Sequence, residues 1–229
     1  FLPGWILATE KGIAIANTPD APTQEVSEWA ITAALMMNRH FLELGRAGDK
    51  EFMVTPGIEG QKIGIIGLGR TGARIAEMLQ VFRPASISYY SRNPKPDVAQ
   101  RLGLEQKELT DVLGQSDITF ICITGDETTQ DYMDAEKIAA VKQDALLVSF
   151  MHPGVINAEA LLDALKQRRF RAISDWPLGD EFNELPMSHW YSMNASNTIT
   201  SSGVQSFSDT AVTSMLNLLE NGTDQNRVN

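Results

Sequence analysis

Residues 62–79 read KIGIIGLGRTGARIAEML, and this stretch decides the fold. It opens with an apolar run typical of a buried strand, and residues 71–82 have the spacing of an amphipathic helix. Between them, Gly67, Gly69 and Gly72 follow the pattern G-x-G-x-x-G. In that pattern the first glycine permits a tight turn, the second lets the backbone approach a pyrophosphate, and the third allows close packing of helix on strand. The stretch therefore predicts a dinucleotide-binding turn, with the phosphates at the amino terminus of the helix.

The rest of the chain alternates short apolar runs with helical patterns. We expect strands at residues 13–16, 62–66, 86–90, 118–122, 145–150, 171–174 and 198–200. We expect helices at residues 23–44, 71–82, 97–102, 106–113, 135–141, 158–168 and 206–220. Buried strands separated by helices indicate a parallel sheet that is covered on both faces. The sequence therefore predicts an α/β protein with a Rossmann-type, doubly wound parallel sheet.

Composition argues against several classes of protein. The 229 residues carry a net charge of −10, which repels phosphate backbones and disfavours nucleic-acid binding. Cys122 is the single cysteine, so no internal disulfide can form and a reducing, cytoplasmic compartment is expected. No apolar run approaches the roughly 18 residues that span a membrane, and the first residues lack a signal-peptide pattern. The three histidines have no metal-ligand spacing, so no metal site is expected.

The second strand of the expected dinucleotide unit ends in the turn SRNPKP, residues 91–96. In many such units this strand ends in an acidic residue that binds the hydroxyls of the adenine ribose. Here Ser91 takes that position, and Arg92 and Lys95 come after it. A carboxylate would repel a 2′-phosphate, whereas a hydroxyl beside two cations would accept it. The turn predicts NADP(H) as the cofactor, with NAD(H) as the alternative if the cations form only a solvated basic turn.

Several stretches, in the same order along the chain, resemble the D-isomer-specific 2-hydroxyacid dehydrogenases. GIAIANTPDAPTQEVSEWA (12–30) resembles the family's entry into a long interdomain helix, and GIIGLGRTG (64–72) resembles its cofactor loop. SDITFICITGDETTQDYMD (116–134) resembles the stretch that contains P-L-T-P-E-T. The segment 145–175 resembles the stretch that begins with N-T-A-R-G-G, and QNRVN (225–229) resembles the usual ending. The cofactor loop is closest to that of the NADP-dependent glyoxylate/hydroxypyruvate reductases.

The resemblance implies two domains. Residues 22–206 would form the dinucleotide-binding domain, including a long interdomain helix over residues 22–45. Residues 1–21 and 207–229 would be remnants of a flavodoxin-like substrate domain, whose first third would precede the sequence given. The same resemblance implies a homodimer formed through the long helix.

In this family a histidine moves the proton, a glutamate keeps that histidine basic, and an arginine binds the substrate carboxylate. The resemblance puts the arginine on His152 and the histidine on Gly203. The glutamate falls on Asp180, or on Glu181 or Glu184 if the longer loop carries an insertion. We therefore expect His152, Asp180 and Glu184 to carry any chemistry.

The cofactor contacts come from the glycine loop, the basic turn and two positions that match the family. They are Gly67, Gly69, Arg70, Thr71, Gly72, Ser91, Arg92, Lys95, Ile123 and Asp175. Among these, Asp175 matches the aspartate that in the family contacts the cofactor's carboxamide.

These substitutions leave three functions open. Gly203 has no side chain to give a proton, and His152 lacks the fork with which arginine binds a carboxylate. An imidazole side chain can still polarise a carbonyl or donate a proton. The first function is an NADP(H)-dependent oxidoreductase that acts on a small carbonyl or hydroxy-acid substrate. The others are a non-catalytic NADP(H)-binding regulator or scaffold, and a fragment that binds nothing tightly.

Overall fold

The computed structural model describes residues 5–44, 54–193 and 200–229. The chain divides into two compact units. The larger unit is Ser27–Asn197, and the smaller one combines Phe1–Val26 with Thr198–Asn229.

The larger unit is built on one seven-stranded sheet in which all neighbouring strands run parallel. Its strands are β1 (Lys62–Ile66), β2 (Ser86–Tyr90), β3 (Glu105–Gln106), β4 (Ile118–Ile121), β5 (Leu146–Ser149), β6 (Arg171–Ser174) and β7 (Trp190–Ser192). Their order across the sheet is β3-β2-β1-β4-β5-β6-β7. The order reverses between β1 and β4, which is the arrangement of a doubly wound fold. The predicted fold class is confirmed.

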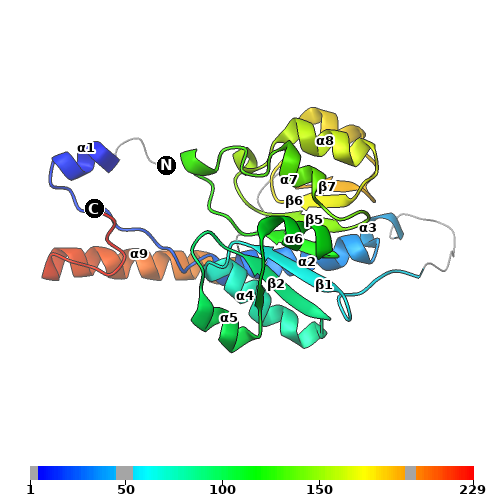
Figure 1. Ribbon diagram of the computed structural model, residues 1–229. Helices are drawn as coiled ribbons and strands as arrows, with labels where there is room; N and C mark the ends of the chain where they lie inside the picture. Colours follow the sequence, from blue (N-terminus) through cyan, green and yellow to red (C-terminus); the bar gives the residue numbers. More distant parts are fainter. Residues whose placement is uncertain (1–4, 45–53, 194–199) are drawn as a thin grey trace. The chain divides into compact units, whose positions relative to one another are not determined.

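Helices cover both faces of this sheet. They are α4 (Arg70–Leu79), α5 (Pro96–Leu102), α6 (Leu109–Gln115), α7 (Ala135–Ala139) and α8 (Ala158–Lys166). Ile66 of β1 belongs to a buried apolar cluster that includes side chains of α6, α7 and α8. The preceding Ile65 lies against Gly72 of α4. Successive side chains of a strand point to opposite faces, so α4 covers the other face of the sheet from α6, α7 and α8. Figure 1 shows these helices around the sheet.

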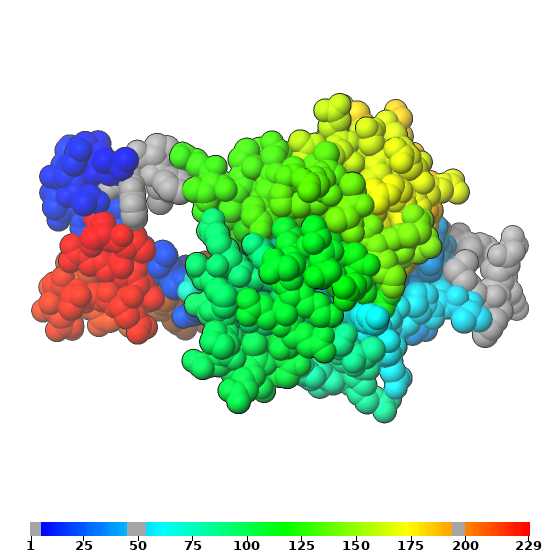
Figure 2. Space-filling view, viewed as in Figure 1, coloured from blue at the N-terminus to red at the C-terminus, as the bar shows by residue number. Residues whose placement is uncertain are grey.

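Figure 2 shows the surface of the larger unit from the same side. The green segments around α5 and α6, together with the yellow-green segments around α7 and α8, form much of the visible face of this unit. The strands β1, β2 and β6 are mostly buried, and β4 and β5 are buried at every position. This matches the continuous apolar runs that parallel strands show when both faces are covered.

The long helix predicted over residues 23–44 is shorter in the structure. Helix α2 (Thr23–Asn38) is followed by His40, which has a left-handed backbone with φ 49°, and by a one-turn helix α3 (Phe41–Leu44). Arg171 explains the end, because its guanidinium donates to the Met37 carbonyl oxygen at 2.9 Å and to Asn38 Oδ1. The Met37 carbonyl oxygen is an acceptor that a further helical turn would have used. The predicted end at residue 45 lies outside the described residues, and the dimer through this helix stays a prediction.

Two strand predictions differ from the structure, and two short strands were not predicted. Residues 13–16 form no strand, and Ala16 makes only a single antiparallel bridge to Arg227. Of the strand predicted at 198–200, the first two residues lie outside the described ones, and Thr200 is the N-cap of helix α9 (Ser201–Asn221). Helix α9 therefore begins at Ser201 and not at residue 206. The missed strands, β3 and β7, lie at the edges of the sheet and have no run of apolar residues long enough to reveal them.

The smaller unit contains α1 (Trp5–Glu10), the first turn of α2 and helix α9. Residues near the C-terminus form backbone hydrogen bonds with the segment between α1 and α2. The Val228 amide donates to the Ile15 carbonyl oxygen, and the Asn17 amide donates to the Asn226 carbonyl oxygen. No helix of the described residues is long and apolar enough to cross a membrane. The expected cytoplasmic location stays a prediction.

Candidate functional site

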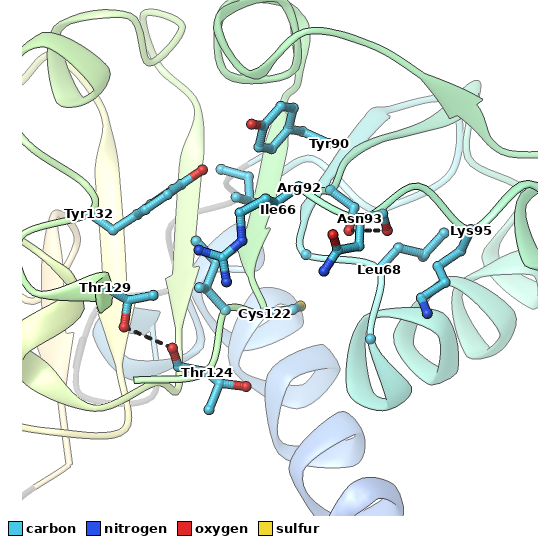
Figure 3. Close-up of a pocket in the computed structure, with 14 residues that line it drawn as sticks. Ile66, Leu68, Tyr90, Arg92, Asn93, Lys95, Cys122, Thr124, Thr129 and Tyr132 are labelled. Atoms are coloured by element: carbon cyan, nitrogen blue, oxygen red, sulfur yellow. Dashed lines mark hydrogen bonds between the residues drawn. The ribbon is translucent and has the colours of Figure 1, made fainter. Parts of the chain in front are cut away.

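A cavity of about 220 Å³ opens in the larger unit where β1, β2 and β4 end. It lies beside the reversal of strand order, the place where ligands bind in open parallel sheets. The lining residues are Ile66, Gly67, Leu68, Gly69, Tyr90, Ser91, Arg92, Asn93, Lys95, Cys122, Ile123, Thr124, Thr129 and Tyr132. Figure 3 shows how they surround the cavity. The cavity thus unites the glycine loop with the basic turn after β2.

Two glycines of the loop are required by the fold itself. Gly67 has φ +100°, and a Cβ there would lie 2.6 Å from the carbonyl oxygen of Cys122. At Gly72, a Cβ would lie 2.2 Å from the carbonyl oxygen of Gly67 and 3.1 Å from Ile65. These glycines let β1 turn sharply into α4 and let the helix lie close against the strand.

Gly69 is different, because a Cβ there would meet nothing within 4 Å. Its backbone is extended, with φ −83° and ψ −163°, so the conformation does not require glycine either. Gly69 is the N-cap of α4, and no side chain caps the amides of that helix. Its bare backbone faces open space at the positive end of a helix dipole, where an approaching phosphate would lie. The loop residues therefore fit the pyrophosphate of a dinucleotide.

The basic turn after β2 lies at the other side of the cavity. The Ser91 hydroxyl donates to the Asn93 carbonyl oxygen at 3.0 Å, which holds the turn together. Arg92 and Lys95 are exposed, and neither forms a salt bridge with another described residue. In Figure 3 Arg92 extends from β2 toward Thr124, while Lys95 lies on the side of Leu68. Two cations that form no salt bridge with the described residues, at the rim of one cavity, are a suitable environment for an anionic group.

Sequence reasoning missed several residues of the cavity, among them Tyr90, Thr124, Thr129 and Tyr132. Tyr132 points its hydroxyl toward Tyr90 (Figure 3), and burial together with Tyr90 raises the pKa of Tyr132 to about 12. Burial also raises the pKa of the Cys122 thiol, which argues against a nucleophilic role. All of these residues end a strand or belong to the loop after β4. The rule that ligands bind at the carboxyl ends of parallel strands would have found them.

Among the predicted cofactor residues, Gly67, Gly69, Ser91, Arg92, Lys95 and Ile123 line the cavity. The first turn of α4 contains Arg70, Thr71 and Gly72, which follow the glycine loop but are not among the residues that line the cavity. Asp175 comes directly after β6, two strands away from β4, and its side chain is only 2% exposed. Its contact with a cofactor stays a prediction.

His152 lies on the turn after β5, where it is the N-cap of a short 3-10 helix, Pro153–Val155. Its Nδ1 accepts the amide of Gly154 at 3.2 Å, which leaves Nε2 of the exposed ring for a ligand. The loop after β4 packs closely on this turn, because a Cβ at Gly125 would lie 2.5 Å from the Cβ of His152. The histidine is therefore held at the carboxyl edge of the sheet, beside the loop that lines the cavity.

The two predicted carboxylates lie elsewhere, in the loop after β6. Asp180 and Glu184 are the ends of the 3-10 helix Asp180–Glu184, and both are exposed. This helix is anchored by Phe182, whose ring packs on that of Trp190 with centroids 4.7 Å apart. Within the described residues, no hydrogen bond or ion pair joins either carboxylate to His152. Their catalytic roles stay predictions.

The sequence of the larger unit matches that of a known protein family. Residues 30–195 match the family model described as D-isomer specific 2-hydroxyacid dehydrogenase, NAD binding domain. The chain belongs to the D-isomer specific 2-hydroxyacid dehydrogenase family. The resemblance inferred from the motifs is thus confirmed.

Curated members of the D-isomer specific 2-hydroxyacid dehydrogenase family are similar to about 70% of this chain. A glyoxylate reductase of Thermococcus kodakarensis is 31% identical over 172 residues, which are 70% of this chain and 51% of the relative. A glyoxylate/hydroxypyruvate reductase of Arabidopsis thaliana is 32% identical over 166 residues, covering 70% of this chain and 52% of the relative. The chain therefore spans about half the length of these relatives.

Solved structures of similar fold cover nearly the whole chain. An acyclic imino acid reductase in complex with NADPH and D-Arg has a TM-score of 0.85 and 21% identity, covering 97% of this chain and 73% of the other. D-2-hydroxyisocaproate dehydrogenase has a TM-score of 0.82 and 18% identity, covering 96% and 73%. At such identities these structures support the 2-hydroxyacid dehydrogenase fold alone.

Proposed function

We propose that the protein binds NADP(H) in the cavity at the ends of β1, β2 and β4. We further propose that it transfers a hydride between the nicotinamide and a small carbonyl or hydroxy-acid substrate. Gly69 is the observation that carries the cofactor assignment, since neither internal packing nor backbone conformation requires glycine there. The curated relatives named glyoxylate reductase support the substrate class. A bound dinucleotide would supply the hydride, and the chain would bind, orient and protonate the substrate.

The preference for NADP(H) rests on the turn after β2. Arg92 and Lys95 line the cavity and form no salt bridge with another described residue, and Ser91 takes the position where an acid would repel a 2′-phosphate. We expect fluorescence titration to give a lower Kd for NADPH than for NADH. The double variant Arg92→Ala/Lys95→Ala should bind NADPH about 10- to 100-fold more weakly, because two charge-assisted contacts are lost.

The same double variant should bind NADH with an affinity close to that of the wild type, since NADH has no 2′-phosphate. Arg101→Ala/Lys166→Ala is a suitable control, because both side chains lie outside the cavity lining. Equal affinity of the wild type for NADH and NADPH would refute the preference, while leaving the dinucleotide site itself in place.

His152 is the side chain that we assign to the carbonyl of the substrate. Its Nε2 is the ring atom not used within the turn, and a positioned acid of this kind contributes about 100-fold or more to a rate. In an assay of NADPH oxidation with glyoxylate or hydroxypyruvate, His152→Ala should lower kcat by about that factor. The Kd for NADPH should not change, because His152 is not among the residues that line the cofactor cavity.

His189→Ala is the matched control, because His189 precedes β7 and lies near Arg168 and Arg171, away from the carboxyl edge of the sheet. An active wild type with an equally active His152→Ala variant would show that the role assigned to this residue is wrong. A wild type that binds NADPH tightly and reduces none of the carbonyl compounds would favour a non-catalytic NADP(H)-binding protein.

A further inference from the structure

Asp126 places a carboxylate beside the wall of the cofactor cavity. It is the N-cap of the 3-10 helix Glu127–Thr129, in the loop after β4. Its Oδ1 accepts hydrogen bonds from the amide and the hydroxyl of Thr128, at 2.7 Å and 2.6 Å. The amide of Asp126 donates to the Thr129 hydroxyl, which donates in turn to the Thr124 carbonyl oxygen at 2.9 Å (Figure 3). Thr124 and Thr129 line the cavity, so these bonds hold the carboxylate next to that wall.

Arg92 is directed toward the same loop. It comes from the turn after β2, on the other side of the cavity, and is exposed. In Figure 3 its side chain extends toward Thr124, whereas that of Lys95 lies on the side of Leu68. The two cations of the basic turn therefore point in different directions. A phosphate bound beside Ser91 and Lys95 can contact the guanidinium of Arg92 only after that side chain turns away from the loop after β4.

The charges of Asp126 and Arg92 act on each other in this arrangement. Hydrogen bonds from Thr128 lower the pKa of Asp126, and the positive charge of Arg92 lowers it further. The Asp126 carboxylate is therefore ionised at neutral pH, and it attracts the guanidinium. Of the described residues, however, no carboxylate forms a salt bridge with Arg92. Because no direct ion pair must break, a phosphate can draw the exposed guanidinium away at a low cost.

The capping role of Asp126 does not explain its charge. Asparagine and serine cap the start of a helix about as well as aspartate does. What aspartate adds is a negative charge, and that charge acts on Arg92. The identity of residue 126 therefore has a consequence for the cation at the cavity, beyond its effect on the loop.

We propose that Asp126 competes with the 2′-phosphate of NADP(H) for Arg92, and so limits the preference of the site for NADP(H) over NAD(H). The inference rests on the proposed binding of NADP(H) in this cavity. With NAD(H) bound, Arg92 stays directed toward the loop after β4, because no phosphate attracts it. With NADP(H) bound, the guanidinium turns to the 2′-phosphate beside Lys95 and loses the attraction of Asp126. Asp126 is thus a specificity-determining residue of the cofactor site.

Asp126→Asn is the variant that tests this competition, because it removes the charge and keeps both the size and the cap. In fluorescence titrations of the intact protein at one ionic strength, the Kd for NADPH should fall about two- to fivefold, the effect of an exposed charge pair. The Kd for NADH and the thermal midpoint should match those of the wild type. In an Arg92→Ala background, Asp126→Asn should leave the Kd for NADPH unchanged, because the side chain for which the two anions compete is absent.

Glu127→Gln is the matched control, because it removes the same charge from the next residue, which is exposed. Its Kd for NADPH should equal that of the wild type. Equal tightening by Glu127→Gln and Asp126→Asn would show a general charge effect and overturn the competition. Tighter NADPH binding by Asp126→Asn that persists without Arg92 would also overturn it, because the carboxylate would then repel the phosphate directly.

Two further results separate this inference from the proposed function. Unchanged or weaker binding of NADPH by Asp126→Asn would overturn the competition, while a preference of the wild type for NADPH would still stand. A wild type with equal Kd for NADPH and NADH would instead refute the proposed preference, and the competition with it.

Discussion

Replacing Gly72 with alanine should markedly lower the thermal midpoint of the protein. The new Cβ would lie 2.2 Å from the carbonyl oxygen of Gly67 and 3.3 Å from its carbonyl carbon. Both are backbone atoms at the end of β1, in the centre of the sheet, so they cannot move as the tip of a side chain can. The helix α4 would have to shift away from the strand on which it packs.

The expected cost of Gly72→Ala is about 3 kcal/mol in the free energy of unfolding, at the upper end of the range for overpacked cores. In a protein of this size such a loss lowers the midpoint by roughly 6–12 °C, measurable by circular dichroism or calorimetry. Gly57→Ala is the control for the general effect of glycine on the unfolded chain, since a Cβ there meets only one backbone atom, at 3.9 Å. A midpoint for Gly72→Ala equal to that of Gly57→Ala would mean that α4 does not need this close approach.

The centre of the sheet is the part of the fold that can be predicted from sequence. The apolar runs at residues 62–66, 86–90 and 171–174 predict strands with the observed bounds, because buried parallel strands are continuously apolar and end at turn residues. The edge strands β3 and β7 are not predicted, because two or three residues pairing on one side leave no apolar signature. The end of α2 at Asn38 also escapes prediction, because its cause is Arg171, which is far away in the sequence.

The residues of the site can be predicted from the sequence only where they belong to a local motif with a known binding role. The glycine loop and the basic turn are such patterns, and the structure brings them to one cavity. Tyr132 reaches the cavity through the loop after β4, and no local pattern in the sequence predicts that position.

Adding a methyl group at Gly69 should give the opposite result from Gly72: a stable protein that no longer holds its cofactor. A Cβ at Gly69 meets no protein atom within 4 Å, and its φ of −83° suits alanine. The methyl group would instead occupy the space over the amides at the start of α4, where the pyrophosphate of a dinucleotide would lie. Loss of one or two charge-assisted hydrogen bonds from those amides should weaken NADPH binding by about 10- to 100-fold.

Stability must be separated from binding, because Gly69 is also the N-cap of α4 and alanine caps a helix less well than glycine. Gly69→Ser removes that difference, since a serine hydroxyl can cap the helix while its Cβ still blocks the amides. Both variants should keep a thermal midpoint near that of the wild type and lose NADPH affinity in fluorescence titrations. In both Gly69 variants the affinity for NADH should fall as much as that for NADPH, because the pyrophosphate is common to both cofactors. The double variant Arg92→Ala/Lys95→Ala, in contrast, should lower the affinity for NADPH alone. Undiminished binding of both cofactors to Gly69→Ser would place the pyrophosphate somewhere other than this loop.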